Sequence, residues 1–484
     1  MTNAPHAGGS GSKGARTTLI GQWLKFAIQL ASTVVLARIL SPGEFGLFAM
    51  IVAFSGLATL LGDFGLSSAA MQAKTLSNQQ RSNLFWINSL IGALCSGLIL
   101  LSAPYIAEFY GQPALFSAIQ ILAPTFLLQA GVSQLAANAA RSLKFSLLAR
   151  VDVASQLVGF LTALALALSG AGVMALVAQQ LAIAISMLAA LGIAGQWLPL
   201  LPRRAEMMPL LKFGANSLLV QLLTYVTSNV DTVLLGRFWG PAALGLYDRA
   251  YQFYRMPIQQ IATPLTRVVI PMLSRRQDDL RWVTGKLVDI QKLIAYFVAG
   301  TFIILASTAW SMVTLLLGES WLPAAPILAV LSLGGVFQAM GYVYYWAFLI
   351  TNQTGVQLRA SLITRSLMVV LIVFGAFLGP IGVATAVALG LASNWAILSG
   401  KPMRATGLDT RLLRRAVLRP ISVHLAANLP TLLVGLLFAG TMPAILTLAL
   451  QVLTAASLYF ALACFNPGFR NDLAKIVVII RKAF

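Results

Sequence analysis

One segment of this chain, residues 243–270, carries the residue types that bind a phosphate-bearing anion. Read as an α-helix, it has two polar stripes, the first made of Asp248, Gln252, Arg255 and Gln259, the second of Arg249, Gln260 and Arg267. Three arginines against one aspartate leave a surplus of positive charge, and the planar guanidinium group matches phosphate oxygens. The candidate substrate-binding residues here are therefore Arg249, Arg255, Arg267, Gln252 and Gln259.

Charged residues in two other apolar stretches extend this candidate site. Lys25 shares a helical face with Thr18, Gln22, Gln29 and Ser32. A charge at mid-bilayer costs at least about 2.5–3.5 kcal/mol, so it usually faces a partner or a water-filled cavity. Asp231 and Asp248 are candidates either for binding a coupling proton or Na⁺ or for serving as fixed counter-charges. Pairing of the arginines with these aspartates is the alternative to substrate binding.

The same segment has prolines at a regular spacing. Pro257, Pro264 and Pro271 recur every seven residues, which places any kinks on similar sides of the helix. A helix that is polar on two stripes cannot face lipid on those sides. We therefore expect a bent helix that lines a cavity.

The composition of the chain is that of a polytopic membrane protein. Of its 484 residues, 58% are hydrophobic and only 10% are charged, whereas soluble domains have about 25% charged residues. The formal net charge is +20, but the cations are too widely spread to form a nucleic-acid-binding stripe, so no nucleic-acid partner is expected. Cys95 and Cys464 lie in apolar runs and indicate neither a disulfide framework nor a metal site.

Stretches of about 20 apolar residues predict an all-α fold with about fourteen transmembrane helices in two pseudo-repeated bundles around a central cavity. The predicted spans are 17–40, 44–62, 84–107, 114–138, 147–169, 172–195, 210–236, 243–270, 287–317, 324–351, 357–378, 380–399, 416–439 and 441–464. The predicted domains are a disordered arm (1–16), an N-lobe (17–195), a linker (196–212), a C-lobe (213–399), a basic linker (400–415), two additional helices (416–465) and a basic tail (466–484).

The charges of the loops predict an orientation. Most Lys and Arg residues lie in the two termini and the even-numbered loops, so both termini are expected to be cytoplasmic. The loops on the other side are only a few residues long, which argues against an extracytoplasmic catalytic domain. Since no P-loop, HExxH pair or nucleophile elbow is present, we expect no enzyme activity, catalytic residue, cofactor or metal.

An internal duplication supports the two-bundle arrangement. Residues 36–48 read LARILSPGEFGLF and residues 235–247 read LGRFWGPAALGLY, at an offset of 199. The polar face around Lys25 recurs at the same offset, ending at Asp231. Such repeats are common in transporters, whose substrate path runs between the two lobes. The shared residues are expected to shape the interhelical turn, and they are Arg38, Pro42, Gly46, Arg237, Pro241 and Gly245.

The first of these motifs and the stretch GLYDRAYQFYRMPIQQIATPLTRVVIPMLSRRQDD resemble the polysaccharide-unit (Wzx-type) flippases. These form the polysaccharide transport family of the multidrug/oligosaccharidyl-lipid/polysaccharide exporter superfamily. The resemblance implies alternating-access transport of undecaprenyl-diphosphate-linked repeat units across the bacterial inner membrane, and partnership with a polymerase and a chain-length regulator. The family pattern maps onto Arg38, Pro42, Phe45, Gly46, Asp231, Gly236, Gly245, Tyr247, Arg249 and Pro257. Asp248 departs from it, since many relatives have Asn there.

Several other classes of protein compete with this interpretation. A cation-coupled multidrug exporter of the same superfamily should present surplus acidic residues to cationic drugs, whereas residues 243–270 have surplus arginine. A lipid II flippase is a closer relative in mechanism. A membrane polysaccharide polymerase would need a sizeable extramembrane loop, and a structural scaffold would not need the charges of the eighth span.

Overall fold

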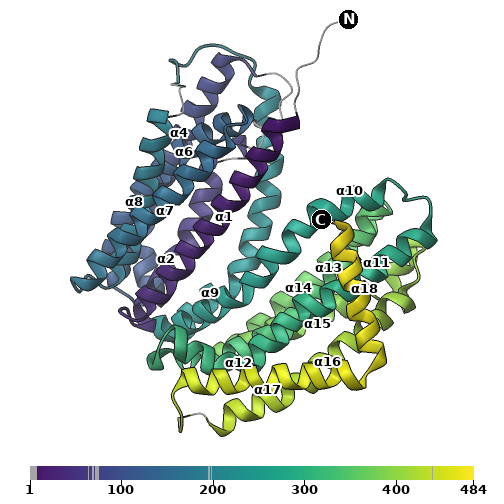
Figure 1. Ribbon diagram of the computed structural model, residues 1–484. Helices are drawn as coiled ribbons and strands as arrows, with labels where there is room; N and C mark the ends of the chain where they lie inside the picture. The colour runs from purple at the N-terminus through teal and green to yellow at the C-terminus, as the bar shows by residue number, and fades with distance from the viewer. Residues whose placement is uncertain are drawn as a thin grey trace, which may run out of the picture. The chain divides into compact units, whose positions relative to one another are not determined.

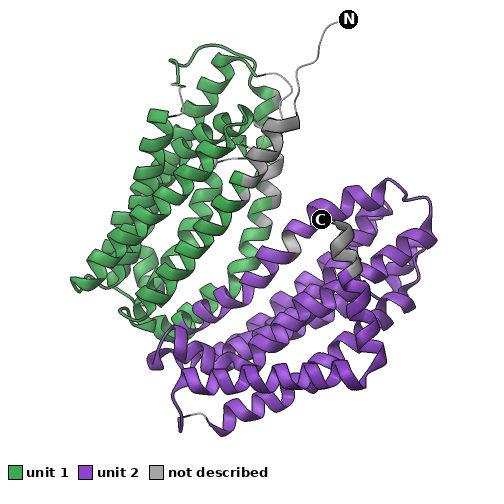
Figure 2. Cartoon of the chain, viewed as in Figure 1, with its two compact units in different colours: residues 1–245 green, residues 246–484 purple. Residues whose placement is uncertain are grey.

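The computed structural model describes residues 8–63, 65–67, 70, 76–194, 197, 199–438 and 440–483. Across these residues the secondary structure is helical and contains no strand (Figure 1). The chain divides into two compact units, residues 1–245 and 246–484 (Figure 2). The predicted all-α class is therefore confirmed.

Unit 1 is an antiparallel helix bundle that ends inside a long helix. Its elements are α1 (Gly8–Ala37), α2 (Pro42–Asp63), α4 (Asn78–Tyr110), α5 (Ala114–Leu122), α6 (Pro124–Arg141), α7 (Phe145–Leu168), α8 (Val173–Ala194) and the first part of α9 (Met208–Pro257). Helix α1 begins at Gly8, so residues 8–16 are helical where the sequence analysis expected disorder. Residues 1–7 lie outside the described residues.

Unit 2 contains the end of α9 and the remaining helices. Its elements are the π-helix η1 (Ile258–Ala262), α10 (Thr263–Ser274), α11 (Leu280–Ile294), the π-helix η2 (Ala295–Ala299), α12 (Gly300–Leu316), η3 (Glu319–Trp321), α13 (Ala324–Ile350), α14 (Thr354–Ala376), α15 (Gly379–Leu398), η4 (Lys401–Thr406), α16 (Thr410–Leu437), α17 (Ala444–Phe465) and α18 (Pro467–Ala483). Both π-helices interrupt longer α-helical runs, and they pack against each other.

Twelve helices in the described part of the chain are long and apolar enough to cross a membrane. Each corresponds to one of the fourteen predicted spans. The other two predicted spans, 210–236 and 243–270, fall on α9, η1 and α10, where the chain is helical but more polar. Gly240 separates them with a non-helical conformation (φ 77°, ψ −176°), which glycine adopts without a Cβ penalty.

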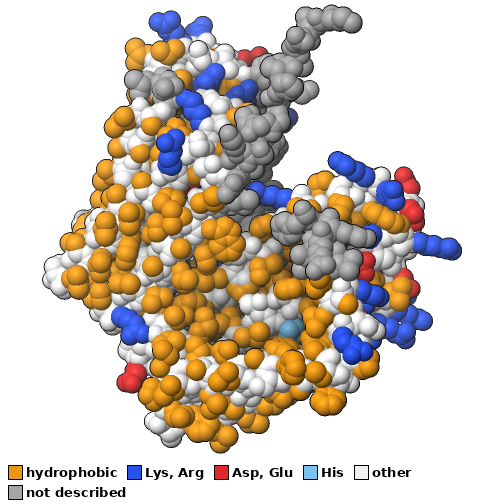
Figure 3. All heavy atoms as spheres, in the orientation of Figure 1, with side chains coloured by type: hydrophobic (Ala, Val, Ile, Leu, Met, Phe, Trp, Pro, Cys, Tyr) orange, Lys and Arg blue, Asp and Glu red, His pale blue; other side chains and the backbone are white. Residues whose placement is uncertain are grey.

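The outer surface of the helices carries exposed apolar side chains, as a lipid environment requires. On α4, four leucines one turn apart are each more than half exposed, namely Leu90, Leu94, Leu98 and Leu101. Figure 3 shows large areas of hydrophobic side chains on the visible face of both units. In water such a surface would drive association, whereas in a bilayer it is solvated by the acyl chains.

The duplicated motifs pack directly on each other within unit 1. A Cβ on Gly46 would lie 1.7 Å from the carbonyl oxygen of Pro241, and a Cβ on Gly245 would lie 1.8 Å from that of Pro42. The two contacts are related by the offset of 199 residues that relates the motifs. Only glycine permits this approach of two backbones, as at other small-residue helix crossings in membranes.

Helix α2 begins with a sequence that stabilises its first turn. The Ser41 side chain accepts a hydrogen bond from the Glu44 N–H (3.3 Å), and the Glu44 carboxylate accepts one from the Ser41 N–H (2.6 Å). Pro42, at the first helical position, needs no hydrogen-bond partner for its nitrogen. This capping box fixes the start of α2, and therefore the height at which Gly46 meets Pro241.

The linker between α8 and α9 is tied to the first turns of α4. Four side chains of α4 donate hydrogen bonds to backbone carbonyls of the linker: Asn83 to Arg203 (2.6 Å), Trp86 to Leu200 (2.8 Å), Gln80 to Glu206 (2.9 Å) and Gln79 to Leu201 (3.0 Å). In the opposite direction, the backbone N–H of Leu200 donates to Ser82 Oγ (3.0 Å), and that of Arg203 donates to Asn83 Oδ1 (3.2 Å). These bonds hold residues 200–206 against the bundle of unit 1.

The C-terminal helices of unit 2 are joined by buried polar contacts. The His424 ring bonds Tyr459 Oη (2.6 Å), which also accepts from Asn428 Nδ2 (2.7 Å). Helix α18 is anchored by Asp472, which is 5% exposed and lies 3.1 Å from Arg419 and 3.5 Å from Lys292. These contacts make the last three helices part of the same compact unit.

The glycine crossing gives the first prediction. Gly46→Ala and Gly245→Ala should each lower the free energy of unfolding by about 1–3 kcal/mol, because the added methyl group forces two backbones apart. Thermal unfolding of the purified protein in detergent measures the effect. The matched control is Gly97→Ala in α4, where nothing lies within 4 Å of the added Cβ. Equal unfolding temperatures for Gly46→Ala and Gly97→Ala would contradict the close crossing.

Candidate functional site

The segment predicted to bind an anion is fixed in unit 2 by its aromatic face. From Leu246 onward it buries Tyr247, Phe253, Tyr254 and Ile258. Tyr254 Oη forms a hydrogen bond with Gln338 Oε1 of α13. Eight residues beyond the start of η1, Thr266 accepts a hydrogen bond from Trp346 Nε1, also on α13 (3.0 Å). The segment is therefore held to α13 on both sides of its π-helical turn.

The π-helical turn lies between two of the regularly spaced prolines. Pro257 ends α9, and Pro264 is the second residue of α10. Proline lacks an N–H and its ring collides with the carbonyl group four residues earlier, so a wider turn with i→i+5 spacing relieves the conflict. The predicted bend is therefore a π-turn. The two polar stripes were predicted with the period of a continuous α-helix, and the wider π-turn changes that period. Arg267, which lies after the turn, is therefore rotated away from the face that it would share with Arg249 in an unbroken α-helix.

Arg249 forms an ion pair with its neighbour in sequence. Its Nη2 and Nε lie 2.5 and 3.2 Å from Asp248 Oδ2. The Arg249 side chain is 12% exposed and that of Asp248 is 31% exposed. The pairing alternative raised by the sequence thus holds for one of the three arginines.

The other two arginines lie on the exposed side of the segment. Arg255 and Arg267 are both exposed, and neither belongs to an ion pair among the residues that the structure describes. The Arg255 guanidinium lies 5.7 Å from the centroid of the Tyr251 ring. This cation–π contact stabilises the guanidinium group but leaves its positive charge in place. Gln259 is exposed and Gln252 is half-buried. The segment therefore offers two guanidinium groups and an amide to a ligand.

In unit 1, Lys25 pairs with an acid that the sequence analysis did not identify. Lys25 Nζ lies 3.4 Å from Asp152 Oδ1 of α7, with the side chains 42% and 33% exposed. Asp152 lies inside the predicted span 147–169, and its position in an apolar stretch was the signal that could have revealed it. Because both side chains remain partly exposed, the pair can exchange one partner for a ligand.

Asp231 is buried in unit 1. It is 5% exposed, and its Oδ1 accepts a hydrogen bond from the Thr232 N–H (2.8 Å). A buried carboxylate with hydrogen-bond donors is suited to a fixed counter-charge or to ion binding. Among the described residues, no group of three or more His, Cys, Asp or Glu side chains is placed to hold a metal ion.

The motif residues have different environments. Pro42, Gly46, Pro241 and Gly245 form the helix crossing described above, while Arg237 lies 5.7 Å from the centroid of the Phe109 ring. Arg38 is exposed in the turn that follows α1. The crossing supports the interpretation that the motif shapes the connection between helices.

The sequence of the chain matches a known family and several named proteins. Residues 35–326 match the family model described as polysaccharide biosynthesis protein. The teichuronic acid biosynthesis protein TuaB of Bacillus subtilis is 27% identical over 74% of this chain and 77% of its own length. The succinoglycan biosynthesis transport protein ExoT of Rhizobium meliloti is 23% identical over 90% of this chain and 91% of its own. The lipopolysaccharide biosynthesis protein WzxC of Escherichia coli is 24% identical over 68% of this chain and 67% of its own length.

The fold resembles solved structures of membrane exporters. The lipid II flippase MurJ, in an inward closed conformation, matches with a TM-score of 0.74 at 16% identity, covering 94% of this chain and 99% of its own. An inward-facing multidrug transporter of the MATE family matches with a TM-score of 0.57 at 13% identity, covering 81% and 96%. The predicted all-α fold with many membrane-spanning helices therefore matches the fold of these two structures. Since the family model spans more than half of the sequence, the chain belongs to the polysaccharide biosynthesis protein family.

Proposed function

We propose that the chain is a flippase that moves undecaprenyl-diphosphate-linked oligosaccharide units across the cytoplasmic membrane. The product would be an exopolysaccharide, a capsule or an O-antigen. Membership of the polysaccharide biosynthesis family supports this proposal, as do relatives named for teichuronic acid, succinoglycan and lipopolysaccharide synthesis. The fold is that of the lipid II flippase MurJ.

The observation that carries the proposal is that two arginines of the segment, Arg255 and Arg267, are exposed. A charged group in a membrane span is expensive and is retained where it faces water or a ligand. Arg255 and Arg267 have no acidic partner among the described residues, while aromatic contacts and α13 hold their helix in place. The diphosphate of the cargo would supply the opposing charge, and arginine can bind its oxygens through paired N–H groups.

The proposed mechanism changes no covalent bond. The cargo headgroup binds to the exposed arginines of the segment, the sugars occupy the polar path, and the polyprenyl tail stays in lipid. Binding then shifts the equilibrium between inward-open and outward-open states. A cationic drug would be repelled by the same side chains, which disfavours the multidrug-exporter alternative.

In this mechanism Arg249 exchanges its partner, from the Asp248 carboxylate to the diphosphate of the cargo. Because Asp248 is about one-third exposed, a diphosphate that enters the site can replace its carboxylate on Arg249. The released carboxylate is then available to a proton or a cation. Asp231 and Lys25–Asp152 are further candidates for counter-charge or coupling, and a polymerase and a chain-length regulator are the proposed partners that consume the product.

The assignment of Arg249 can be tested in proteoliposomes by comparing its single variant with a double variant that also changes Asp248. The assay measures how fast an undecaprenyl-diphosphate oligosaccharide becomes accessible to a membrane-impermeant glycosidase. Arg255→Gln and Arg249→Gln should each slow translocation at least about tenfold, because charged hydrogen bonds contribute about 1.5–3 kcal/mol. Asp248→Asn/Arg249→Gln should stay as slow as Arg249→Gln.

The double variant separates binding from charge balance. If Arg249 only neutralises Asp248, removing both charges restores translocation to the wild-type rate, and the substrate-binding role is wrong. The matched control is Arg359→Gln, which removes an exposed arginine of α14 outside the segment. It should leave the rate unchanged.

The proposed orientation places both termini in the cytoplasm, as the loop charges predict. Single cysteines at the ends of the spans, in a background without Cys95 and Cys464, can be labelled in intact cells with a membrane-impermeant maleimide. A cysteine at Ser169 should be labelled, because it follows α7 in an odd-numbered loop, whereas one at Ser142 should be protected until the membrane is permeabilised. The reverse pattern would contradict the orientation.

A further inference from the structure

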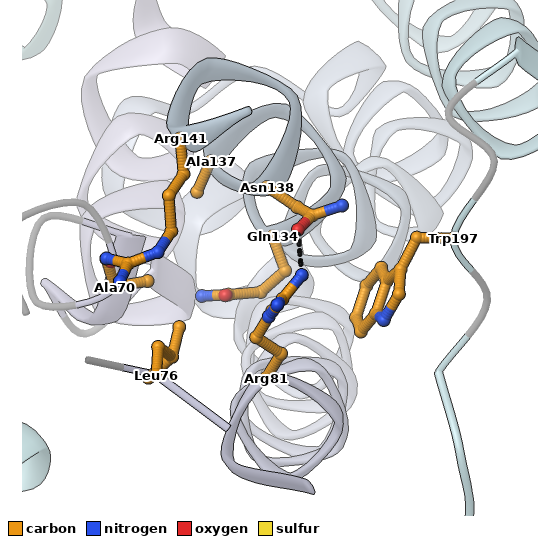
Figure 4. A pocket seen from close by; sticks show the side chains of 8 residues that line it. All are labelled: Ala70, Leu76, Arg81, Gln134, Ala137, Asn138, Arg141 and Trp197. Carbon is orange, nitrogen blue, oxygen red and sulfur yellow. Dashed lines mark hydrogen bonds between the residues drawn. The ribbon is translucent and has the colours of Figure 1, made fainter. Parts of the chain in front are cut away.

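A small pocket in unit 1 has unpartnered buried donors. It lies where the start of α4 meets the end of α6, and Figure 4 shows the side chains around it. The lining consists of Ala70, Leu76, Arg81, Gln134, Ala137, Asn138, Arg141 and Trp197. The pocket is small, and its empty volume of about 240 Å³ includes open solvent at its mouth. The pocket therefore suits one small group.

Two of its polar atoms are donors that have no acceptor. Gln134 is 4% exposed, and its Nε2 is buried without a hydrogen-bond partner. Arg81 Nη1 donates to Asn138 Oδ1 (2.9 Å), but its buried Nε also has no partner. A buried donor left unsatisfied costs about 1–3 kcal/mol, and more when the group is charged. Both donors line the same pocket, so one acceptor can satisfy both.

The charge of the pocket specifies what that acceptor is. Arg81 and Arg141 bring two guanidinium groups to it, and no acidic side chain lines it among the described residues. In Figure 4 the Gln134 amide lies between the two guanidinium groups. Arg141 Nη1 is held by the Ala70 carbonyl (3.0 Å), which fixes its position at the pocket wall. A ligand with several acceptor oxygens and at least one negative charge fits these donors.

The surroundings hold the pocket in shape. Its apolar wall belongs to a core cluster that includes Ala70, Leu84 and Ala137, with Leu76 packed against it. On another side, Trp197 precedes the linker residues 200–206 that are hydrogen-bonded to α4. The donors are thus positioned by two helices and by the tied linker, as a binding site requires.

We propose that this pocket binds a phosphate group. Arginine forks and an amide N–H match the oxygens of a phosphate, which accepts hydrogen bonds and donates none when ionised. The pocket lies at the end of unit 1 that the loop charges predict to be cytoplasmic. The phosphate belongs either to a soluble or cargo-borne phosphate ester or to an anionic phospholipid headgroup, and both present the same chemistry to Arg81, Gln134 and Arg141. This site does not depend on the role proposed for Arg249 and Arg255.

The test uses the full-length protein in nanodiscs and compares two sources of phosphate. In discs of phosphatidylcholine alone, radiolabelled inorganic phosphate is titrated at constant ionic strength and its binding is measured by equilibrium dialysis. In parallel, thermal unfolding is followed in discs with and without phosphatidylglycerol. Saturable phosphate binding identifies the soluble source. Stabilisation by phosphatidylglycerol without phosphate binding identifies the lipid headgroup.

Two variants of Gln134 locate the binding. Gln134→Glu replaces the unpartnered donor with a carboxylate that pairs with the arginines, so the ligand-free protein should unfold at or above the wild-type temperature while phosphate affinity falls at least about tenfold. Gln134→Met removes the donor without adding charge, and it should also weaken binding. Arg150→Gln is the control, since Arg150 is exposed on α7 outside the pocket.

The proposal is overturned by either of two results. One is that neither phosphate nor phosphatidylglycerol affects the wild-type protein. The other is that Gln134→Glu and Gln134→Met respond to them as wild type does, which would place the binding elsewhere. The pocket variants and the Arg249 variants are measured separately, so failure of this site leaves the flippase proposal to its own experiment.

Discussion

The bilayer interior solvates charge poorly, and this constraint organises the polar residues of the structure. A charge inside such a medium needs an opposite charge, a set of hydrogen bonds, or access to water or a ligand. Lys25 pairs with Asp152, and Arg249 pairs with Asp248. Arg255 and Arg267 belong to no ion pair among the described residues, and they are the exposed arginines of the segment that carries the proposed substrate site.

The rigidity of that segment comes from packing rather than from charge. The Tyr247 ring stacks on that of Tyr251 (5.6 Å between centroids), and the Tyr254 ring contacts Tyr251 at a tilt (5.4 Å). Hydrogen bonds to α13 flank the π-turn. The backbone that carries the exposed arginines is therefore held in a fixed position on α13. Directly before the segment, the Gly46–Pro241 and Gly245–Pro42 contacts fix where the second copy of the motif lies against the first.

Apolar length and repetition carry most of the fold information in the sequence. Twenty-residue apolar runs predicted the positions of the helices because a bilayer sets their length, and the offset of 199 residues relates the two glycine contacts. The compact units divide after Gly245, however, because the first part of α9 packs on α2, where Tyr225 Oη donates to the Val52 and Ala53 carbonyls (3.0 Å each). The domain boundaries drawn from the repeats stay predictions.

The sequence revealed less of the candidate site, since side-chain partners are set by tertiary packing. Local spacing identified Asp248 beside Arg249, but the Asp152 partner of Lys25 lies more than a hundred residues away on another helix. The π-turn follows from the prolines only once the helix is packed against α13. The pocket of Arg81, Gln134 and Arg141 combines α4, α6 and Trp197, and no local pattern links these residues.

The central claim is translocation of a lipid-linked oligosaccharide, and its direct test is the leaflet in which that lipid accumulates when the protein is removed. A deletion strain is treated with a periplasm-confined probe of the oligosaccharide, before and after permeabilisation of the membrane. The account predicts that the lipid-linked units are labelled only after permeabilisation, and that the wild-type gene restores labelling in intact cells. Accumulation on the periplasmic side in the deletion strain would contradict it, because the protein would then act after translocation.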